Sequence, residues 1–416
     1  MSKRTAIDAI KKKLTGKSLT YSEIFSVMDE IAHQRLGPIL TTYFAAAGFQ
    51  GGFSDDELYS LTKAMVETGK RLHLTGIVAD KHSTGGVAGT RTTMIVVPIV
   101  AAAGITIPKN SSRAITSASG TGDTMEALAN VTFTVHEIEQ LVKKTGGCIV
   151  WGGHLGIAPA DDVLIQVEEP LAFESFDKVI VSIMAKKVAS SATHLVLDLP
   201  VGPFMKIKHF KDAEIIADKF RKLAQRFNIK ITVDINHTRE PAGRGVGPVL
   251  EVRDVFQILE QDNTRPLALE EKALRLAGKL LSLCFEDMPE RKGQSGEDVA
   301  REMLVSGAAL SKMREIIKAQ GGNPNVSSKK LELGMHTYDV VSSKSGRISQ
   351  VHNQQINTVA RILGSPNDKK AGIYLYRRLE ERVAEGETLF TMYSSNKWRM
   401  EEAIQTVKHL PVYTVE

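Results

Sequence analysis

Two hydroxyl- and glycine-rich loops, each next to a short apolar run, constrain the fold of this chain more than any other feature. The first anion loop is residues 80–93, and the second anion loop is residues 111–123. The strand-like run 77–79 precedes the first loop, and the apolar run 94–103 that follows is long enough for a buried helix. A strand, a glycine-rich turn and a helix N-terminus together present free backbone N–H groups to an anion. We therefore expect an α/β fold with the two loops as two walls of one anion site; the alternative is small-residue turns packed between strand and helix.

The first anion loop also carries side chains of the kind that bind phosphate. Lys81 supplies a point charge, and Ser83 and Thr92 supply hydroxyl donors. Neither common phosphate motif, G-x-x-x-x-G-K-S/T or G-x-G-x-x-G, occurs here. His82 lies inside the loop and is interpreted as a structural residue rather than a base. The loop therefore predicts a phosphate-using enzyme whose site differs from those two motifs.

The composition is that of an ordinary soluble chain that can hold two or three domains. The 416 residues are 42% hydrophobic and 24% charged, as in globular proteins. The net charge of +5 is mild, and no dense basic stripe with interleaved aromatic residues suggests nucleic acid. Cys148 and Cys284 are the only cysteines, which excludes a disulfide framework and suits a reducing cytoplasm. No signal peptide is recognisable, and no charge-free apolar run reaches the roughly 18–20 residues that span a bilayer, so we expect no membrane partner.

The order of the apolar patterns predicts a helical domain, an α/β domain and a C-terminal α+β lobe. The first 70 residues read as helices, with possible capping boxes at Thr20–Glu23 and Ser54–Glu57. From about residue 75 short strands alternate with helices, which favours a parallel or mixed sheet. The expected strands of this sheet are 77–79, 106–108, 148–151, 194–198 and 229–234. The expected domains are 1–70 with 164–192 (helical), 75–163 with 193–333 (α/β) and 334–416 (the lobe).

Three residues between positions 174 and 186 could act on a heterocycle. Ser182 and Lys186 are four residues apart, so they share one face of a predicted helix. Glu174 lies eight residues before Ser182 and could approach the same face. A carboxyl, a hydroxyl and an ammonium group together could bind a base and deliver a proton. The alternative is that Lys186 and Lys187 form an ordinary solvated helix end.

Three further features could form parts of a site. Lys206 follows an apolar strand and a Gly-Pro turn, near a strand end where open α/β sheets bind ligands, or it is a routine surface lysine. Residues 240–247 form a glycine-rich loop that could close over a site or serve as a plain connector. Asp161 and Asp162 have no third ligand at a useful spacing, and the histidines form no metal-binding motif. We therefore expect no metal.

Taken together, these loops and their neighbours resemble the thymidine phosphorylase family, and most closely its AMP (nucleoside monophosphate) phosphorylase branch. The matching stretches occur in order through nearly the whole chain, which is far more specific than any single motif. They lie at 81–87, 112–117, 120–123, 182–187 and 200–203, with further matches at 151–153, 158–162, 243–248 and 301–307.

The resemblance implies a nucleoside phosphorylase and phosphoribosyltransferase-like architecture, with the active site between the helical domain and the α/β domain. It implies phosphorolysis, in which phosphate attacks C1′ of the sugar and the base leaves. Inorganic phosphate is then a substrate, and no cofactor or metal is required. The AMP branch carries an extra N-terminal domain linked to large assemblies, whereas this chain begins at the helical domain. We therefore expect a cytoplasmic homodimer formed through the helical domain.

The resemblance also assigns roles to individual residues. By resemblance, the residues that bind phosphate are expected to be Lys81, Ser83, Thr92, Ser111 and Thr121. Its nucleotide-binding residues are Gly86, Ser112, Arg113, Ala114, Ile115, Thr116, Ser117, Ser182 and Lys206. Its catalytic residues are Glu174, which stands where the AMP branch has an aspartate proton donor, and Lys186, which matches a lysine that contacts the base.

Three positions differ from the AMP branch and bear on the substrate. Glu174 is one methylene longer than the usual aspartate, which moves the acid by about 1 Å. Gln166 replaces an arginine expected near the base, and Gly156 replaces a common asparagine. The leading hypothesis is phosphorolysis of a nucleoside 5′-monophosphate such as AMP, which gives free base and ribose 1,5-bisphosphate. Arg113 and its hydroxyl neighbours would hold the second phosphate.

Three alternatives stay open. One is a pyrimidine nucleoside phosphorylase acting on thymidine or uridine, which differs from the leading hypothesis in needing no monophosphate. Another is a phosphoribosyltransferase resembling the anthranilate enzyme, which would need magnesium and a diphosphate sugar. The third is a non-catalytic nucleotide-binding homologue, which would bind a nucleotide without releasing the base.

Overall fold

The computed structural model describes residues 3–114, 117–153, 155–168 and 175–416. Its helices are α1 (Lys3–Leu14), α2 (Tyr21–Ala32), α3 (Pro38–Gly51), α4 (Asp55–Glu67), α5 (Thr93–Ala102), α6 (Thr121–Glu126), α7 (Val135–Thr145), α8 (Pro159–Glu168), α9 (Phe176–Ala189), α10 (Phe210–Arg226), α11 (Pro248–Leu259), α12 (Leu267–Phe285), α13 (Gly296–Val305), α14 (Ala308–Ala319), α15 (Asn353–Leu363) and α16 (Lys397–His409). Its strands are β1 (Ala79–Ser83), β2 (Ile107–Ser111), β3 (Gly147–Trp151), β4 (His194–Val201), β5 (Lys230–His237), β6 (Gly245–Val246), β7 (His336–Val341), β8 (Gly346–Val351), β9 (Gly372–Leu375), β10 (Arg382–Val383), β11 (Thr388–Ser394) and β12 (Tyr413–Val415).

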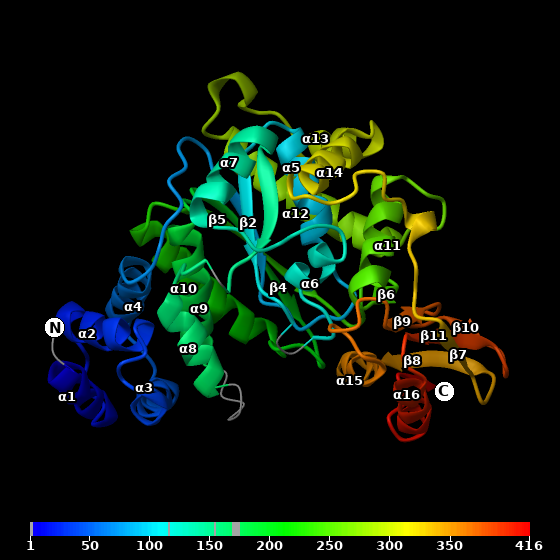
Figure 1. Cartoon of the computed structure of the whole chain (residues 1–416), viewed down its shortest axis with the longest axis horizontal. Coiled ribbons are helices and arrows are strands. Elements are labelled where there is room, and N and C mark those ends of the chain that lie inside the picture. The colour runs from blue at the N-terminus through cyan, green and yellow to red at the C-terminus, as the bar shows by residue number, and fades with distance from the viewer. Residues whose placement is uncertain (1–2, 115–116, 154, 169–174) are drawn as a thin grey trace.

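A parallel sheet occupies the centre of the molecule, as the alternation of strands and helices predicted (Figure 1). Strand β1 pairs with β4, β4 pairs with β5, and β2 pairs with β3, all in parallel. A parallel bridge between Val78 and Thr106 connects the β1 group to the β2 group. The order across the sheet is therefore β5-β4-β1-β2-β3. Because the strands are parallel, Ser83 at the end of β1 and Ser111 at the end of β2 direct both anion loops to the same edge.

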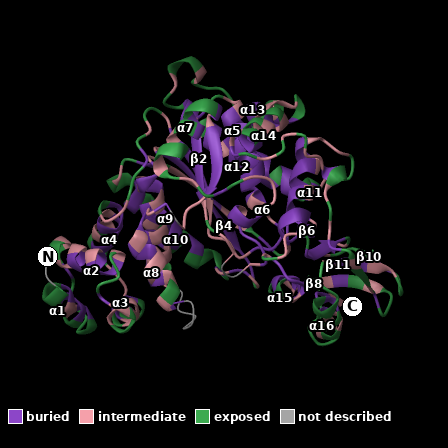
Figure 2. Ribbon diagram, viewed as in Figure 1, coloured by how far each residue is buried: buried purple, intermediate pink, exposed green. Residues whose placement is uncertain are grey.

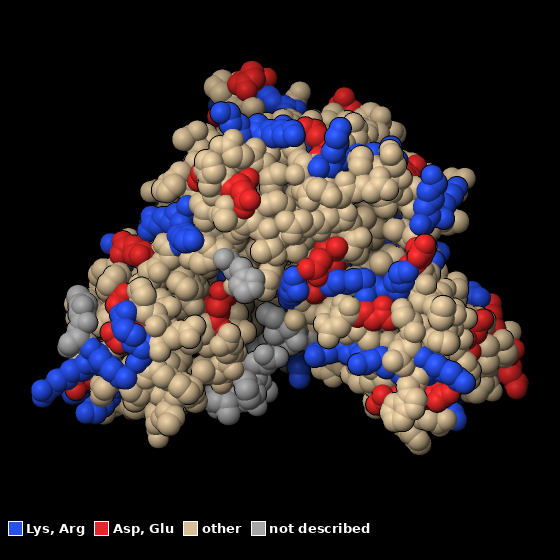
Figure 3. Space-filling view, in the orientation of Figure 1, with Lys and Arg blue, Asp and Glu red and all other residues tan. Residues whose placement is uncertain are grey.

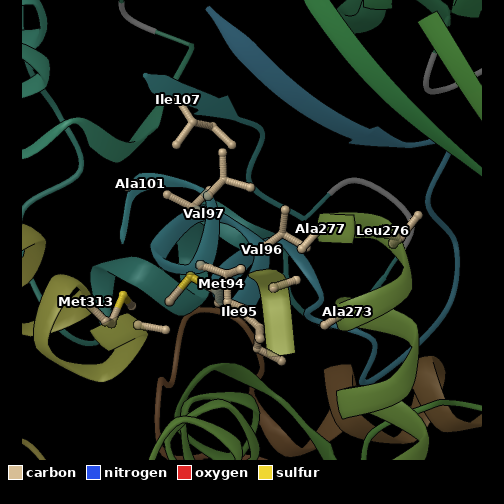
Figure 4. Close-up of a cluster of buried hydrophobic side chains, with 14 of the residues drawn as sticks. Met94, Ile95, Val96, Val97, Ala101, Ile107, Ala273, Leu276, Ala277 and Met313 are labelled. Carbon is tan, nitrogen blue, oxygen red and sulfur yellow. The ribbon is translucent and has the colours of Figure 1, made fainter. Parts of the chain in front are cut away.

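One side of this sheet is covered by a cluster of buried apolar side chains centred on α5. Helix α5 is the apolar run predicted as a buried helix, and its residues from Met94 to Val100 are almost wholly inaccessible to solvent. A helix with no polar face must be packed on all sides. Figure 4 shows its side chains against those of β2, α12 and α14. Figure 2 shows that buried residues are concentrated in the sheet and in the helices next to it.

The helical part, α1 to α4 with α8 and α9, lies at one end of the molecule (Figure 1). Both predicted capping boxes are present, at the starts of α2 and α4. Helix α9 belongs to two apolar clusters at once. Val181 and Ala185 pack into the helical part, whereas Ile180 and Met184 pack against β4 and α10. Helix α9 therefore packs against both the helical part and the central sheet.

The C-terminal lobe lies at the opposite end of the molecule from the helical part (Figure 1). It contains the antiparallel sheet β6-β9-β11-β7, a second sheet of β10, β8 and β12, and helices α15 and α16. Strand β6 comes from the glycine-rich segment 240–247, which pairs with β9 in this sheet. Gly243 N also donates to Gly89 O at 2.9 Å, and Arg378 donates to Ala242 O at 2.9 Å. In this structure the segment therefore connects the first anion loop to the lobe, which agrees with the alternative of a connector. In the parts of the chain that the structure describes, no helix is long and apolar enough to cross a membrane.

Two glutamates at equivalent capping positions provide a test of the packing of the helical part. Glu57 caps α4 and also accepts from buried Lys13 at 2.9 Å, whereas Glu137 caps α7 at an exposed site. We predict that Glu57→Gln lowers the free energy of unfolding by about 3 kcal/mol, because Lys13 is left buried without its counter-charge. Glu137→Gln should cost less than about 1 kcal/mol. Urea unfolding followed by circular dichroism measures both, and equal losses would contradict the assigned role of the buried pair.

Candidate functional site

Residues 80–83 of the predicted first anion loop belong to strand β1, and the ammonium group of Lys81 on this strand lies at the N-terminus of α5. Its Nζ donates to Thr92 Oγ1 at 2.9 Å and to Thr93 Oγ1 at 3.4 Å. The side chain is only 2% exposed, and this burial lowers the pKa of Lys81 to about 8, partly offset by the charge of Asp198. A bound anion would reverse this effect. Two of the predicted phosphate-binding residues, Lys81 and Thr92, are thus in direct contact, and Ser83 ends the strand that carries Lys81.

A buried glutamate links the two anion loops through hydrogen bonds and an ion pair. The carboxylate of Glu251, on α11, accepts from Arg91 Nε at 2.7 Å in the first loop. The same carboxylate accepts from Thr124 Oγ1 at 2.7 Å, just beyond the second loop. Arg91 also donates from Nη2 to Ser119 O at 2.7 Å inside the second loop. The two loops therefore lie side by side, and their role as two walls of one anion site stays a prediction.

Aspartate and backbone contacts shape the second anion loop. Buried Asp123 accepts from Gly120 N at 2.9 Å and from Ala114 N at 2.7 Å. Ser112 O accepts from Gly122 N at 3.1 Å, so the loop folds back on itself. The hydroxyl of Ser117 donates to Ser119 O at 2.7 Å. Of the other predicted residues here, Ser111 ends β2, Thr121 begins α6, and Ile115 and Thr116 lie outside the described residues.

Arg113, expected to hold a second phosphate, has protein partners instead. Its guanidinium group is paired with the carboxylate of Glu126 and stacks 4.2 Å above the ring of Trp151. The carboxylate of Glu126 is also within 2.7 Å of Lys369, from the C-terminal lobe. A phosphate at Arg113 would therefore have to compete with an existing ion pair.

Ser182 and Lys186 share one face of α9, as their spacing predicted. Ser182 Oγ donates to Asp161 Oδ2 at 2.7 Å, and Lys186 Nζ lies 2.7 Å from the same oxygen. Asp161 is fully buried, and although burial opposes its ionisation, Lys186 keeps its pKa below the usual value. Sequence reasoning considered Asp161 only as half of a metal pair and missed this contact. Among the described residues, no group of three or more His, Cys, Asp or Glu residues could hold a metal ion.

A charged cluster lies beneath the loops and joins α9 to strands β1 and β2. Asp80 accepts from Lys187 at 2.6 Å through Oδ2 and from Lys109 at 3.1 Å through Oδ1. Lys187 is 1% exposed, so the alternative of a solvated helix end is wrong, and burial lowers its pKa to about 7. Burial and the surrounding lysines, including Lys187 and Lys109, also lower the pKa of His82 well below its usual value. One carboxylate between two amines leaves an electropositive environment under the loops.

Two more lysines border the same region. Gly86 has a φ of +85°, and a Cβ atom placed there would lie 3.4 Å from Lys206 Cγ, so the stem of Lys206 follows the first anion loop. Lys178 precedes Ser182 by one turn of α9, is paired with Glu168 and has a side chain that is 16% exposed. Its pKa is lowered to about 8 by burial, with Lys186 and Lys206 contributing. Sequence reasoning missed Lys178, although its spacing of four residues from Ser182 was visible. Glu174, the predicted proton donor, lies outside the described residues.

On the face of the molecule in Figure 3, lysine and arginine side chains gather where the central part meets the C-terminal lobe, with acidic side chains beside them. This mixture agrees with the ion pairs that Glu126 forms with Arg113 and Lys369. Near the second anion loop, Arg113 and Lys369 share the carboxylate of Glu126, so the charges of both are partly neutralised.

Three family models match the chain in sequence order. They are the glycosyl transferase family helical bundle domain at residues 7–69, the glycosyl transferase family a/b domain at 75–310, and the pyrimidine nucleoside phosphorylase C-terminal domain at 347–413. The a/b model alone spans more than half of the chain.

Similar sequences and structures agree with this match. A "Putative thymidine phosphorylase" of Rhodopseudomonas palustris is 43% identical over 402 residues, which are 96% of this chain and 76% of that protein. An "AMP phosphorylase" of Methanospirillum hungatei is 40% identical, with 99% of this chain and 79% of that protein covered. The crystal structure of anthranilate phosphoribosyltransferase from Thermus thermophilus has a TM-score of 0.61 and 19% identity, and it matches 76% of this chain and 100% of that one. The structural likeness concerns the fold alone.

The neighbouring carboxylates Asp161 and Asp162 should respond to neutralisation in opposite ways. Asp161→Asn should lower the free energy of unfolding by about 2 kcal/mol at pH 7, because Lys186 loses its buried partner. Burial raises the pKa of Asp162 to about 6, above its ordinary 3.8, so ionised Asp162 reduces stability as pH rises through that interval. Asp162→Asn should therefore leave stability at pH 7 unchanged or slightly higher. Urea unfolding at pH 7 measures both variants, and a larger loss for Asp162→Asn would contradict the assignment.

Proposed function

The chain belongs to the glycosyl transferase family that combines a helical bundle domain with an a/b domain, and we propose that it is a pentosyltransferase that cleaves a nucleoside 5′-monophosphate with inorganic phosphate. The products are the free base and ribose 1,5-bisphosphate. The observation that carries this proposal is the ammonium of Lys81, buried among hydroxyl groups where Glu251 fastens the two anion loops together. Relatives at about 40% identity that are named AMP phosphorylase and "Putative thymidine phosphorylase" support nucleoside phosphorylase activity.

In this proposal the attacking phosphate lies between the two loops. The residues assigned to it are Lys81, Ser83, Thr92, Ser111 and Thr121. Cleavage of an N-glycosidic bond passes through an oxocarbenium-like state, as glycoside hydrolysis does. A phosphate dianion held beneath C1′ stabilises that cation and is already placed to attack it. The buried lysines around Asp80 favour the dianion electrostatically.

The base lies toward α9, where Lys186 and Ser182 contact it and Asp161 holds both side chains in place. Glu174 is the proposed proton donor to the departing base. The sugar and the 5′-phosphate are assigned to Gly86, Lys206 and the second anion loop from Ser112 to Ser117. Lys178 lies one turn before Ser182 on α9, but it is paired with Glu168, so it does not replace the arginine that was expected where the chain has Gln166.

A second candidate function is a pyrimidine nucleoside phosphorylase acting on thymidine or uridine. One observation favours it: Arg113, the residue proposed for the second phosphate, is already paired with Glu126 and stacked on Trp151. The match of residues 347–413 to a pyrimidine nucleoside phosphorylase C-terminal domain is consistent with either substrate class.

We also propose a homodimer formed through the helical part, in a reducing cytoplasm. Helix α3 exposes three large apolar side chains, which are Ile39, Tyr43 and Phe49. An exposed apolar stripe on one helix is the kind of surface that a second subunit covers. Both cysteines, Cys148 and Cys284, are free and buried, which is consistent with the proposed location.

The proposed reaction predicts base release that depends on phosphate. AMP, CMP, UMP, adenosine, uridine and thymidine are each incubated with the enzyme, with and without phosphate, and free base is measured by chromatography. We expect release from a monophosphate but not from its nucleoside. Release from thymidine or uridine instead would establish the second candidate, and no release from any of the six would reject both.

The low pKa of Lys81 predicts how activity depends on pH. The ratio kcat/KM for phosphate reports groups of the free enzyme. Because the pKa of Lys81 is about 8, this ratio should fall roughly tenfold per pH unit above pH 8, as the ammonium loses its charge. Lys81→Gln should have a low ratio that stays flat above pH 8. If the decline persists in Lys81→Gln, the titrating group is another residue.

A further inference from the structure

Both anion loops insert a small side chain into the apolar core of the C-terminal lobe. Ala88 of the first loop is 1% exposed, and Ala118 of the second loop is fully buried. Both belong to the same cluster as Ile356 and Ala360 of α15. The lobe and the two loops therefore share one core, although the lobe begins more than 200 residues later in the chain.

Two buried asparagines on α15 form hydrogen bonds with the backbone of the two loops at these same alanines. Asn353 accepts from Ala88 N at 2.8 Å and donates to Gly86 O at 2.5 Å. Asn357, one turn further along, accepts from Ala118 N at 2.9 Å and donates to Asn353 O at 3.1 Å. Each side-chain amide thus uses both its oxygen and its nitrogen, and one helix fixes a point in each loop.

The part of the first loop that Asn353 holds has little regular structure of its own. Gly85, Gly86 and Gly89 all have positive φ angles. Because glycine has no Cβ atom, it has more backbone conformations open to it than other residues, so contacts from elsewhere are needed to fix this part of the loop. The side-chain amide of Asn353 bonds to the backbone on both sides of Val87, at Gly86 O and Ala88 N, and so holds this part of the loop in one conformation. A displacement of about 1 Å in a group that positions a substrate can cost two orders of magnitude in rate.

We propose that phosphate binding depends on the C-terminal lobe, because Asn353 and Asn357 are positioning residues that set the conformation of the two anion loops. This inference rests on the proposed function, since it concerns the same phosphate. Neither asparagine touches substrate; each acts through the backbone of the loop it holds. Loss of either amide should therefore weaken phosphate binding more than it weakens the fold.

The test compares three alanine variants in the full chain. Asn353→Ala and Asn357→Ala each remove one of the two contacts to the loops. The matched control is Asn396→Ala, because Asn396 is in the same lobe but caps α16 by accepting from Trp398 N at 2.9 Å. For each protein we would measure Tm without ligand, the Kd for inorganic phosphate from the rise of Tm with phosphate concentration, and KM for phosphate.

We expect Kd and KM for phosphate to rise about tenfold in Asn353→Ala and Asn357→Ala, and to stay unchanged in Asn396→Ala. If Asn353→Ala fails to fold, Asn357→Ala decides the question alone. Unchanged phosphate Kd in the two loop variants, with Tm lowered as in the control, would overturn the positioning role. If the unaltered enzyme itself binds no phosphate, the proposed function fails, and this result is distinct from the previous one.

Discussion

The buried carboxylate of Glu251 is the contact on which the geometry of the candidate site depends. It joins Arg91 of the first anion loop to Thr124 beside the second, and it orients the guanidinium group of Arg91, which also donates to Ser119 O of the second loop. Two other buried carboxylates act in the same way. Asp80 gathers Lys109 and Lys187 beneath the loops, and Asp161 holds Ser182 and Lys186 on α9. A buried ion pair often adds little net stability, so positioning is the better explanation for all three.

The fold follows from the sequence wherever a local pattern carries the information. The run after the first anion loop became buried helix α5, both predicted capping boxes formed, and the predicted strands built a parallel sheet. The first strand was placed too early: β1 is Ala79–Ser83, so it shares only Ala79 with the predicted run 77–79 and takes in the first residues of the predicted loop. For the segment 240–247 the sequence left two alternatives open, a closing loop and a plain connector, because a glycine can serve either purpose. A Cβ atom at Gly243 would lie 2.2 Å from Gly89 O, so this glycine permits close packing instead.

The site was predicted less completely, because its partners come from distant parts of the chain. The spacing of Ser182 and Lys186 was visible, but Asp161 belongs to α8, and only the packing of α8 against α9 brings them together. Asn353 and Asn357 lie more than 200 residues from the loops they hold, and no local pattern identifies them. In the same way, only the tertiary structure shows that Arg113 is paired with Glu126 and stacked on Trp151.

The central claim is that an inorganic phosphate, held between the two anion loops, is the nucleophile that displaces the base. The most direct measurement follows the oxygen atoms. The enzyme, a substrate that releases base and phosphate labelled in all four oxygens with ¹⁸O are combined, and the sugar product is analysed by mass spectrometry and ³¹P NMR. The account predicts a C1-phosphorylated sugar that retains all four labelled oxygens. Unlabelled sugar, with the phosphate left unconsumed, would mean that water is the nucleophile and would contradict the account.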